Sequence, residues 1–178
     1  KKVGLPCFVK PNRSGSSYGI VKVYEKQDLN EAIATALKED NQLIIEAALV
    51  GTEISVGAYG IDGEVMILPI TEIISENDFF DYDAKYNGKS QEITPARLDA
   101  NTVEEVHNNV KKLYRQLGLS GVCRSEFIIE GGTPHLLEVN TIPGLTAASL
   151  IPQQVSAAGI ELSDFFESLL TEAMKKPL

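Results

Sequence analysis

Four polar side chains with the types and spacing to do chemistry stand in a largely apolar segment, CRSEFIIEGGTPHLLEVN, at residues 123–140. They are Arg124, Glu126, Glu138 and Asn140. The central glycines predict a β-hairpin, and a three-residue turn at 131–133 would place Glu126 opposite Glu138 and Arg124 opposite Asn140. Because side chains alternate across a strand, all four would share one face, opposite a core face of Phe127, Ile129, Leu137 and Val139. A one-residue slip would break this arrangement, so the prediction depends on the turn.

Two carboxylates in direct opposition need an explanation. They repel by about 1 kcal/mol at 4 Å in water, and by about 4 kcal/mol at an effective dielectric near 20. Either one carboxylate holds a proton, or a cation lies between them. Asn140 adds a third oxygen at the same end, and oxygen-only ligands suit Mg²⁺. The alternative is a solvated polar face with Arg124 as counter-ion, and the hairpin alone leaves both interpretations open.

A second segment, KPNRSGSSYG at residues 10–19, has the composition of a phosphate-binding loop. Its lysine, glycines and serines supply an ammonium group, backbone N–H groups and hydroxyls, which together can surround phosphate oxygens. The segment matches neither the P-loop pattern GxxxxGK[ST] nor the dinucleotide pattern GxGxxG. A plain flexible hairpin loop is the alternative.

The elements that position these segments are predicted from periodicity and turn residues. Strands are expected at 7–9, 20–24, 42–47, 53–60 and 63–70, the last two around a turn at Asp62 and Gly63. One helix is expected over 28–39, begun by a capping box of Asp28 and Glu31, with Leu29, Ile33 and Leu37 on one face.

The second half of the chain predicts two further helices. The first covers 102–117, with Val103, Val106, Val110, Leu113 and Leu117 on one face and Gly118 as its stop. After the hairpin come a loop at 141–152 and a final helix containing Phe165, Phe166, Leu169, Leu170 and Met174. Residues 71–97 are polar, aromatic-rich and without period, which favours a functional lid over disorder. Antiparallel hairpins mixed with helices predict the α+β class.

Composition excludes some classes of function. The chain has 178 residues, enough for one domain or two small lobes, and a formal charge of −9, which argues against nucleic acid as a partner. No apolar run approaches the roughly 20 residues of a membrane helix. The two cysteines, Cys7 and Cys123, stand apart in apolar stretches, so we expect reduced core thiols and a cytoplasmic protein.

Taken together, the motifs resemble the ATP-grasp ligases, and most closely the C-terminal two-thirds of D-alanine–D-alanine ligases. The motifs that carry the resemblance are VKPNRSGSSYGI, IIEAALVGTEISV, FFDYDAKY, CRSEFII and LLEVNTIPGLTAASLIP. The resemblance implies an ATP-grasp fold in two parts. Residues 1–52 would form a partial central subdomain with the glycine-rich loop, and 53–178 a C-terminal domain with the lid at 71–97 and the metal-binding hairpin.

The resemblance also implies roles for individual residues. The positions matched to ATP are Lys10 and Lys85 at the phosphates, Glu53 at the ribose, and Glu46, Ala47, Leu49, Phe79 and Ile128 at the adenine. Those matched to two magnesium ions, with manganese possible, are Glu126, Glu138 and Asn140. Those matched to catalysis are Arg124, which stabilises the acyl phosphate and tetrahedral intermediate, and Ser16 with Tyr86, which tie the glycine loop to the lid. Those matched to the D-amino acid are Gly144, Ser149 and Leu150.

The activity implied is the ATP-dependent ligation of two D-alanines through an acyl phosphate, for peptidoglycan precursors, by a homodimeric enzyme. Glu126 stands where an aspartate is usual, and Ala47–Ala48 replace a typical lysine–aromatic pair. The family's N-terminal domain has no counterpart here, so we expect a fragment that is inactive alone. Alternatives are another carboxylate–amine ligase, such as a D-alanine–D-lactate ligase, or a nucleotide-binding module without catalysis.

Overall fold

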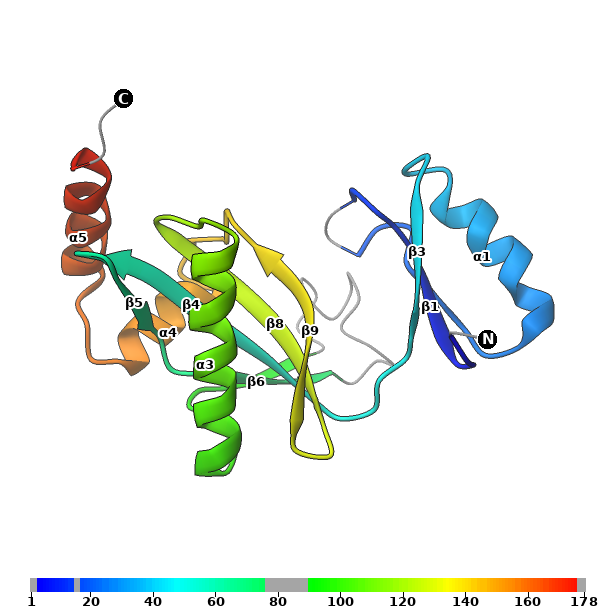
Figure 1. Ribbon diagram of the computed structural model, residues 1–178, viewed down its shortest axis with the longest axis horizontal. Coiled ribbons are helices and arrows are strands. Elements are labelled where there is room, and N and C mark those ends of the chain that lie inside the picture. Colours follow the sequence, from blue (N-terminus) through cyan, green and yellow to red (C-terminus); the bar gives the residue numbers. More distant parts are fainter. Residues whose placement is uncertain (1–2, 15–16, 76–89, 176–178) are drawn as a thin grey trace. The chain divides into compact units, whose positions relative to one another are not determined.

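The computed structural model describes residues 3–14, 17–75 and 90–175 (Figure 1). The chain divides into two compact units, one within Lys1–Val50 and the other formed by Gly51–Ile74 and Gln91–Leu178. Each unit has its own hydrophobic core. In the part of the chain that the structure describes, no helix is long and apolar enough to cross a membrane.

The first unit is a three-stranded antiparallel sheet packed against one helix. Its strands, in the spatial order β2-β1-β3, are β1 (Cys7–Pro11), β2 (Val21–Val23) and β3 (Leu43–Ala47). A 3₁₀ turn, η1 (Lys26–Asp28), leads into helix α1 (Leu29–Ala36). Alternate residues of β1 are buried, so Cys7 and Val9 join Val23 and two helix alanines in the core.

The start and the face of α1 differ from the prediction. The side chain of Asp28 makes no capping hydrogen bond, because this residue ends the 3₁₀ turn with helical angles (φ −82°, ψ −10°), whereas a capping residue needs an extended backbone. The fully buried helix residues are Ala32 and Ala36, and Leu37, just beyond the helix, is 48% exposed.

The second unit contains a six-stranded sheet. Its strands are β4 (Thr52–Ile61), β5 (Glu64–Ile67), β6 (Thr71–Ser75), β7 (Ser90–Ile93), β8 (Val122–Glu130) and β9 (Thr133–Asn140). They lie in the order β7-β6-β4-β8-β9, with β5 paired to β4. The pairings of β4 with β5, β6 and β8, and of β8 with β9, are antiparallel, which confirms the α+β class. Asp62 and Gly63 form the expected turn, both with positive φ.

Among the residues that the structure describes, three helices cover the two faces of this sheet (Figure 1). They are α3 (Ala100–Gln116), α4 (Leu150–Ala157) and α5 (Leu162–Met174). Helix α3 packs Val106, Val110 and Tyr114 on alternate residues of β4 and β8, including Ile54 and Phe127. Helices α4 and α5 pack on the other face, where Tyr59 meets Ile151 and Phe165. The polar residues of β4 and β8 continue along that second face.

Two predictions about regular structure were incomplete. The expected loop at 141–152 ends at Ser149, because α4 begins at Leu150; Pro152 falls in the first turn, where a proline costs no intrahelical hydrogen bond. The segment 71–97 begins in β6 and ends after β7. Its two ends are held together by a hydroxyl contact between Thr71 and Thr94 (2.7 Å), and by Arg97, which donates to both oxygens of Glu72 at 2.6 and 2.9 Å.

Candidate functional site

Three cross-strand rows bring the predicted polar residues of the second unit together. In the first row Gly57 pairs with Arg124, which pairs with Asn140. In the second, Ser55 pairs with Glu126, which pairs with Glu138. In the third, Glu53 pairs with Ile128, so the residues matched to ribose and adenine are cross-strand neighbours. Paired residues share a face of a sheet, which confirms that the four hairpin side chains lie on one face.

The turn that produces this register is not the predicted one. Glu130 pairs with Thr133, so the loop has two residues, Gly131 and Gly132, with φ of 59° and 86°. Two positive φ values are the requirement of a type I′ hairpin turn, which a Gly-Gly pair meets without strain.

A β-bulge restores the predicted pairing at the other end of the hairpin. A two-residue turn alone would place Glu126 opposite Leu137. The register shifts between Glu126 and Phe127, so that Phe127 pairs with Leu136 while Glu126 pairs with Glu138. Leu137 is the extra residue. The predicted three-residue turn would have paired Ile128 with Leu136, which is wrong, because His135 faces Ile128.

Arg124 and Glu126 are joined by an ion pair. Arg124 Nη2 and Nε donate to Glu126 Oε1 at 2.7 and 3.1 Å. Both side chains are largely buried, at 16% and 5% exposed. Arg124 is therefore the counter-ion of Glu126, as in the alternative interpretation of the hairpin, but these two side chains are largely buried, whereas Glu138 on the same face is exposed. Both hydrogen bonds end on Oε1, so Oε2 takes part in neither.

Asn140 ends β9 and shapes the loop that follows. Its Oδ1 accepts a hydrogen bond from the backbone N–H of Ile142 at 3.0 Å. A carbonyl oxygen has a second lone pair, so this bond leaves the amide able to accept another contact. The loop continues to helix α4 and contains one buried residue before Leu150, Pro143.

The three residues matched to the D-amino acid lie at the start of α4. Ser149 is its capping residue, and its hydroxyl lies 2.9 Å from that of Thr146. A side chain on Gly144 would meet Ser149 Oγ at 2.8 Å, so this glycine packs against the helix start. Leu150 is buried and begins the helix.

The first unit by itself contains another ion pair between predicted site residues. Lys10 of β1 and Glu46 of β3 approach to 2.6 Å on the sheet face opposite α1. The lysine side chain is 20% exposed and the glutamate side chain 37%. Ala47 and Leu49 follow directly on the chain, exposed and half-buried respectively.

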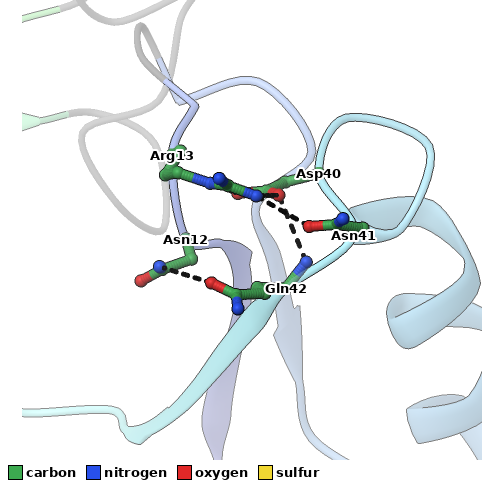
Figure 2. A network of polar contacts seen from close by, with 5 residues as sticks. All are labelled: Asn12, Arg13, Asp40, Asn41 and Gln42. Carbon is green, nitrogen blue, oxygen red and sulfur yellow. Dashed lines mark hydrogen bonds and ion pairs between the residues drawn. The ribbon is translucent and has the colours of Figure 1, made fainter.

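Where the glycine-rich loop leaves β1, a polar network fixes its base (Figure 2). Arg13 donates to both carboxylate oxygens of Asp40 at 2.7 and 3.1 Å and to Asn41 Oδ1 at 2.7 Å. Asn12 Nδ2 lies 3.4 Å from Gln42 Oε1. The hydrogen bond from Arg13 lowers the pKa of Asp40 to about 2. The network ties the start of the loop to the turn before β3.

Four predicted site residues lie outside the described residues: Ser16, Phe79, Lys85 and Tyr86. Within residues 3–14, 17–75 and 90–175, no group of three or more His, Cys, Asp or Glu side chains could hold a metal ion. The predicted metal ligands include only two such side chains, Glu126 and Glu138, because the third ligand is the amide of Asn140.

One polar residue beside the site, Gln154, was not predicted. Gln154 of α4 is completely buried and makes hydrogen bonds to β4 and β6. A glutamine at an inward position of an apolar helix was a visible signal, but the helix itself was not predicted.

Comparisons with known proteins agree with this architecture. The chain matches a protein family described as "D-ala D-ala ligase C-terminus" over residues 1–171. It is 58% identical over 170 residues to a D-alanine–D-alanine ligase of Flavobacterium johnsoniae, which covers 96% of this chain and 53% of that protein. The chain spans about half the length of the curated relatives it matches.

Two solved structures share the fold. The VanG D-Ala:D-Ser ligase from Enterococcus faecalis superposes with a TM-score of 0.81 at 36% identity, covering 93% of this chain and 49% of that one. The D-alanine–D-alanine ligase from Bacillus anthracis complexed with ATP gives 0.79 at 34% identity, covering 97% and 54%. The fold is therefore the expected ATP-grasp fold. The chain belongs to the C-terminal family of the D-alanine–D-alanine ligases.

Proposed function

We propose that the whole protein joins two D-alanine molecules at the expense of ATP, producing a dipeptide for peptidoglycan precursors. The observation that carries the proposal is the single face of β8 and β9 that holds Arg124, Glu126, Glu138 and Asn140 in a chain of this family. The substrates are ATP and D-alanine. From the family resemblance we also propose a cytoplasmic homodimer.

In the proposed reaction the carboxylate of the first D-alanine attacks the γ-phosphate of ATP and releases ADP. The amine of the second D-alanine then attacks the acyl carbon and expels phosphate. Both steps gather negative charge at one place, so catalysis consists mainly of positioning and positive electrostatics. Arg124 suits this role because its planar fork stays charged and can hold two oxygens at once.

The oxygen-only set of Glu126, Glu138 and Asn140 fits magnesium. Bound Mg²⁺ would neutralise phosphate charge. Glu126 can keep its pair with Arg124 through Oε1 and present Oε2 to the ion, while Asn140 retains a lone pair beyond its bond to Ile142. This use of both oxygens reconciles the ion pair with a metal site.

The other roles are proposed as the resemblance assigns them. Nucleotide contacts would come from Lys10, Glu46, Ala47, Leu49, Glu53, Phe79, Lys85 and Ile128. Gly144, Ser149 and Leu150 would hold the second D-amino acid, where the loop meets the buried start of α4. Ser16 and Tyr86 would tie the glycine loop to the lid.

A second candidate is a ligase with another second substrate. The similarity to the VanG D-Ala:D-Ser ligase favours D-serine as the compound to compare. D-lactate, which would give an ester, is the further comparison.

The test is ADP release by the whole protein, with D-alanine, D-serine or D-lactate, and mass spectrometry of the product. We expect ADP release that requires D-alanine and yields D-alanyl-D-alanine. Arg124→Lys, which keeps the charge but not the fork, should lower kcat by about 100-fold. The matched control is Arg115→Lys on α3, whose side chain is 60% exposed and should leave kcat unchanged. No D-alanine-dependent ADP release would refute the proposal.

A further inference from the structure

Strand β4 has a gap in its backbone pairing where it changes partners. On one edge it pairs with β6 as far as Ser55 and with β5 from Ala58 onward. Gly57 falls between the two registers, and its carbonyl accepts a hydrogen bond from Leu68 at 2.9 Å. The next residue of the connection is Pro69, which has no N–H to donate. The sheet therefore lacks a complete strand neighbour at 55–57.

The side-chain amide of Gln154 takes the place of that neighbour. Its Oε1 accepts from the Gly57 N–H at 3.0 Å, and its Nε2 donates to the Ser55 carbonyl at 2.9 Å. Nε2 also donates to Thr71 Oγ1 on β6 at 2.9 Å. A main-chain N–H only donates and a carbonyl only accepts, so these partners fix the orientation of the amide. One glutamine of α4 thus behaves as a peptide unit of the sheet.

The approach of α4 to the sheet requires glycine at position 57. A Cβ there would lie 2.6 Å from Gln154 Oε1, 2.7 Å from Ile151 Cδ1 and 2.8 Å from Leu68 Cδ1. Any side chain at this position would push the helix away and lengthen the hydrogen bonds of Gln154.

Gln154 connects two groups of site residues. Its strand partners, Ser55 and Gly57, pair directly with Glu126 and Arg124 of β8. On its own helix it lies one turn after Leu150, four residues on, so the two side chains project on the same side. We call the hydrogen bonds of Gln154 to Ser55, Gly57 and Thr71 the polar clasp. This clasp fixes the start of α4 relative to β8, the strand that carries Arg124.

We propose that Gln154 is a positioning residue. It fixes the position of the Ser149–Leu150 end of α4 relative to Arg124, and so sets the affinity for the second D-amino acid. This inference rests on the function proposed above. ATP binding is assigned to other positions and should not depend on Gln154.

A purely structural role would give a different pattern. Val155, the next residue of α4, is also completely buried and packs with Phe165 and Leu68, but it makes no polar contact with β4 through its side chain. Val155→Ala therefore loosens the packing of the same helix without removing the clasp. It is the matched control for Gln154→Met, which keeps the volume and loses the amide.

The experiment measures KM for D-alanine, KM for ATP, kcat and Tm of the whole protein and its variants. Gln154→Met should raise KM for D-alanine about tenfold, with KM for ATP within about twofold of the parent value. Thr71→Val, which removes one of the three hydrogen bonds, should shift KM for D-alanine in the same direction by about threefold. Val155→Ala should lower Tm and leave both KM values unchanged. Equal effects of Gln154→Met and Val155→Ala on KM for D-alanine would overturn the proposal.

Hydrogen exchange separates this inference from the proposed function. In Gln154→Met, the amides of Gly57 and of 149–151 should exchange faster than in the parent, whereas Val155→Ala should not expose Gly57. A parent protein without D-alanine-dependent activity would refute the proposed function, and the exchange result would still decide whether Gln154 holds the start of α4. Unchanged exchange at Gly57 in Gln154→Met would refute the positioning role whatever the activity.

Discussion

Arg124 and Glu126 lie two residues apart on one face of β8, and both of their hydrogen bonds end on the same oxygen of Glu126. The pair neutralises a buried carboxylate and leaves its second oxygen outside the interaction. One glutamate side chain can therefore form a structural ion pair through one oxygen and bind a metal ion through the other.

The ion pair predicts strong coupling between its two members. Arg124→Met leaves Glu126, with a side chain only 5% exposed, without its cation, and should cost about 3 kcal/mol of unfolding free energy. The double variant Arg124→Met/Glu126→Met should recover most of this loss, because no buried charge remains. Chemical denaturation of the parent, both single variants and the double variant measures the coupling. Additive losses would show that the two side chains do not depend on each other.

Gly57 predicts a steric effect that depends on position within β4. Gly57→Ala places a Cβ within 2.8 Å of three atoms of packed side chains and should destabilise the protein by about 1–3 kcal/mol. The control is Gly60→Ala on the same strand, where the nearest atom is Tyr114 Oη at 3.0 Å. Thermal unfolding should show the smaller loss at Gly60, and the reverse order would contradict the close approach of α4.

The network at the base of the glycine-rich loop predicts a pH dependence. Arg13 lowers the pKa of Asp40 to about 2, below its ordinary value of 3.8. A carboxyl with a depressed folded pKa stabilises the protein above its unfolded pKa, and this stabilisation is lost as pH falls from about 4 to about 2. The Tm difference between the parent and Asp40→Asn should be constant above about pH 5 and shrink steadily as the pH falls from about 4 to about 2.

The control for this pH effect is Glu64→Gln. Glu64 is 78% exposed and lies 3.9 Å from Arg115. The Tm difference between the parent and Glu64→Gln should change little between about pH 5 and pH 2, because an exposed ion pair contributes little to stability. A Tm difference between the parent and Asp40→Asn that stays the same from about pH 5 to about pH 2 would contradict the assignment.

Burial predicts that Cys123 is chemically inert. Its thiol is 2% exposed, and burial raises its pKa to about 11. The thiolate is the reactive form, so Cys123 should resist iodoacetamide at pH 8.5 in the folded protein and react after unfolding. Labelling a Cys7→Ser variant, followed by mass spectrometry, reports on this thiol. Rapid labelling of the native protein would show that the strand opens.

Much of the hairpin could be predicted because alternation and charge are local properties of a sequence. The shared face of Arg124, Glu126, Glu138 and Asn140 follows from period two and from a register that pairs the carboxylates. The two-residue turn and the bulge at Leu137 could not be predicted. Each shifts the register by one residue, and the two shifts cancel, so the pairing of Glu126 with Glu138 is the same with both as with neither.

The remainder of the site depends on tertiary contacts. Helix α4 is short and has a proline in its first turn, so its period is weak in the sequence, and its first three residues were assigned to the preceding loop. The role of Gln154 depends on the part of β4 between its pairing with β6 and its pairing with β5, and on Pro69. Both are far from Gln154 in the sequence. Such a contact has no signature within either segment.

Calorimetric titration of Mg·ATP into the whole protein tests the central claim most directly, with Glu138→Ala and Glu130→Ala as a matched pair from one hairpin. Glu138 lies in the row of Glu126, whereas Glu130 lies beside the turn at the other end. We predict binding by the parent that requires magnesium, a loss of about tenfold or more in Glu138→Ala, and no change in Glu130→Ala. Glu138→Ala that binds Mg·ATP as tightly as the parent would contradict the account.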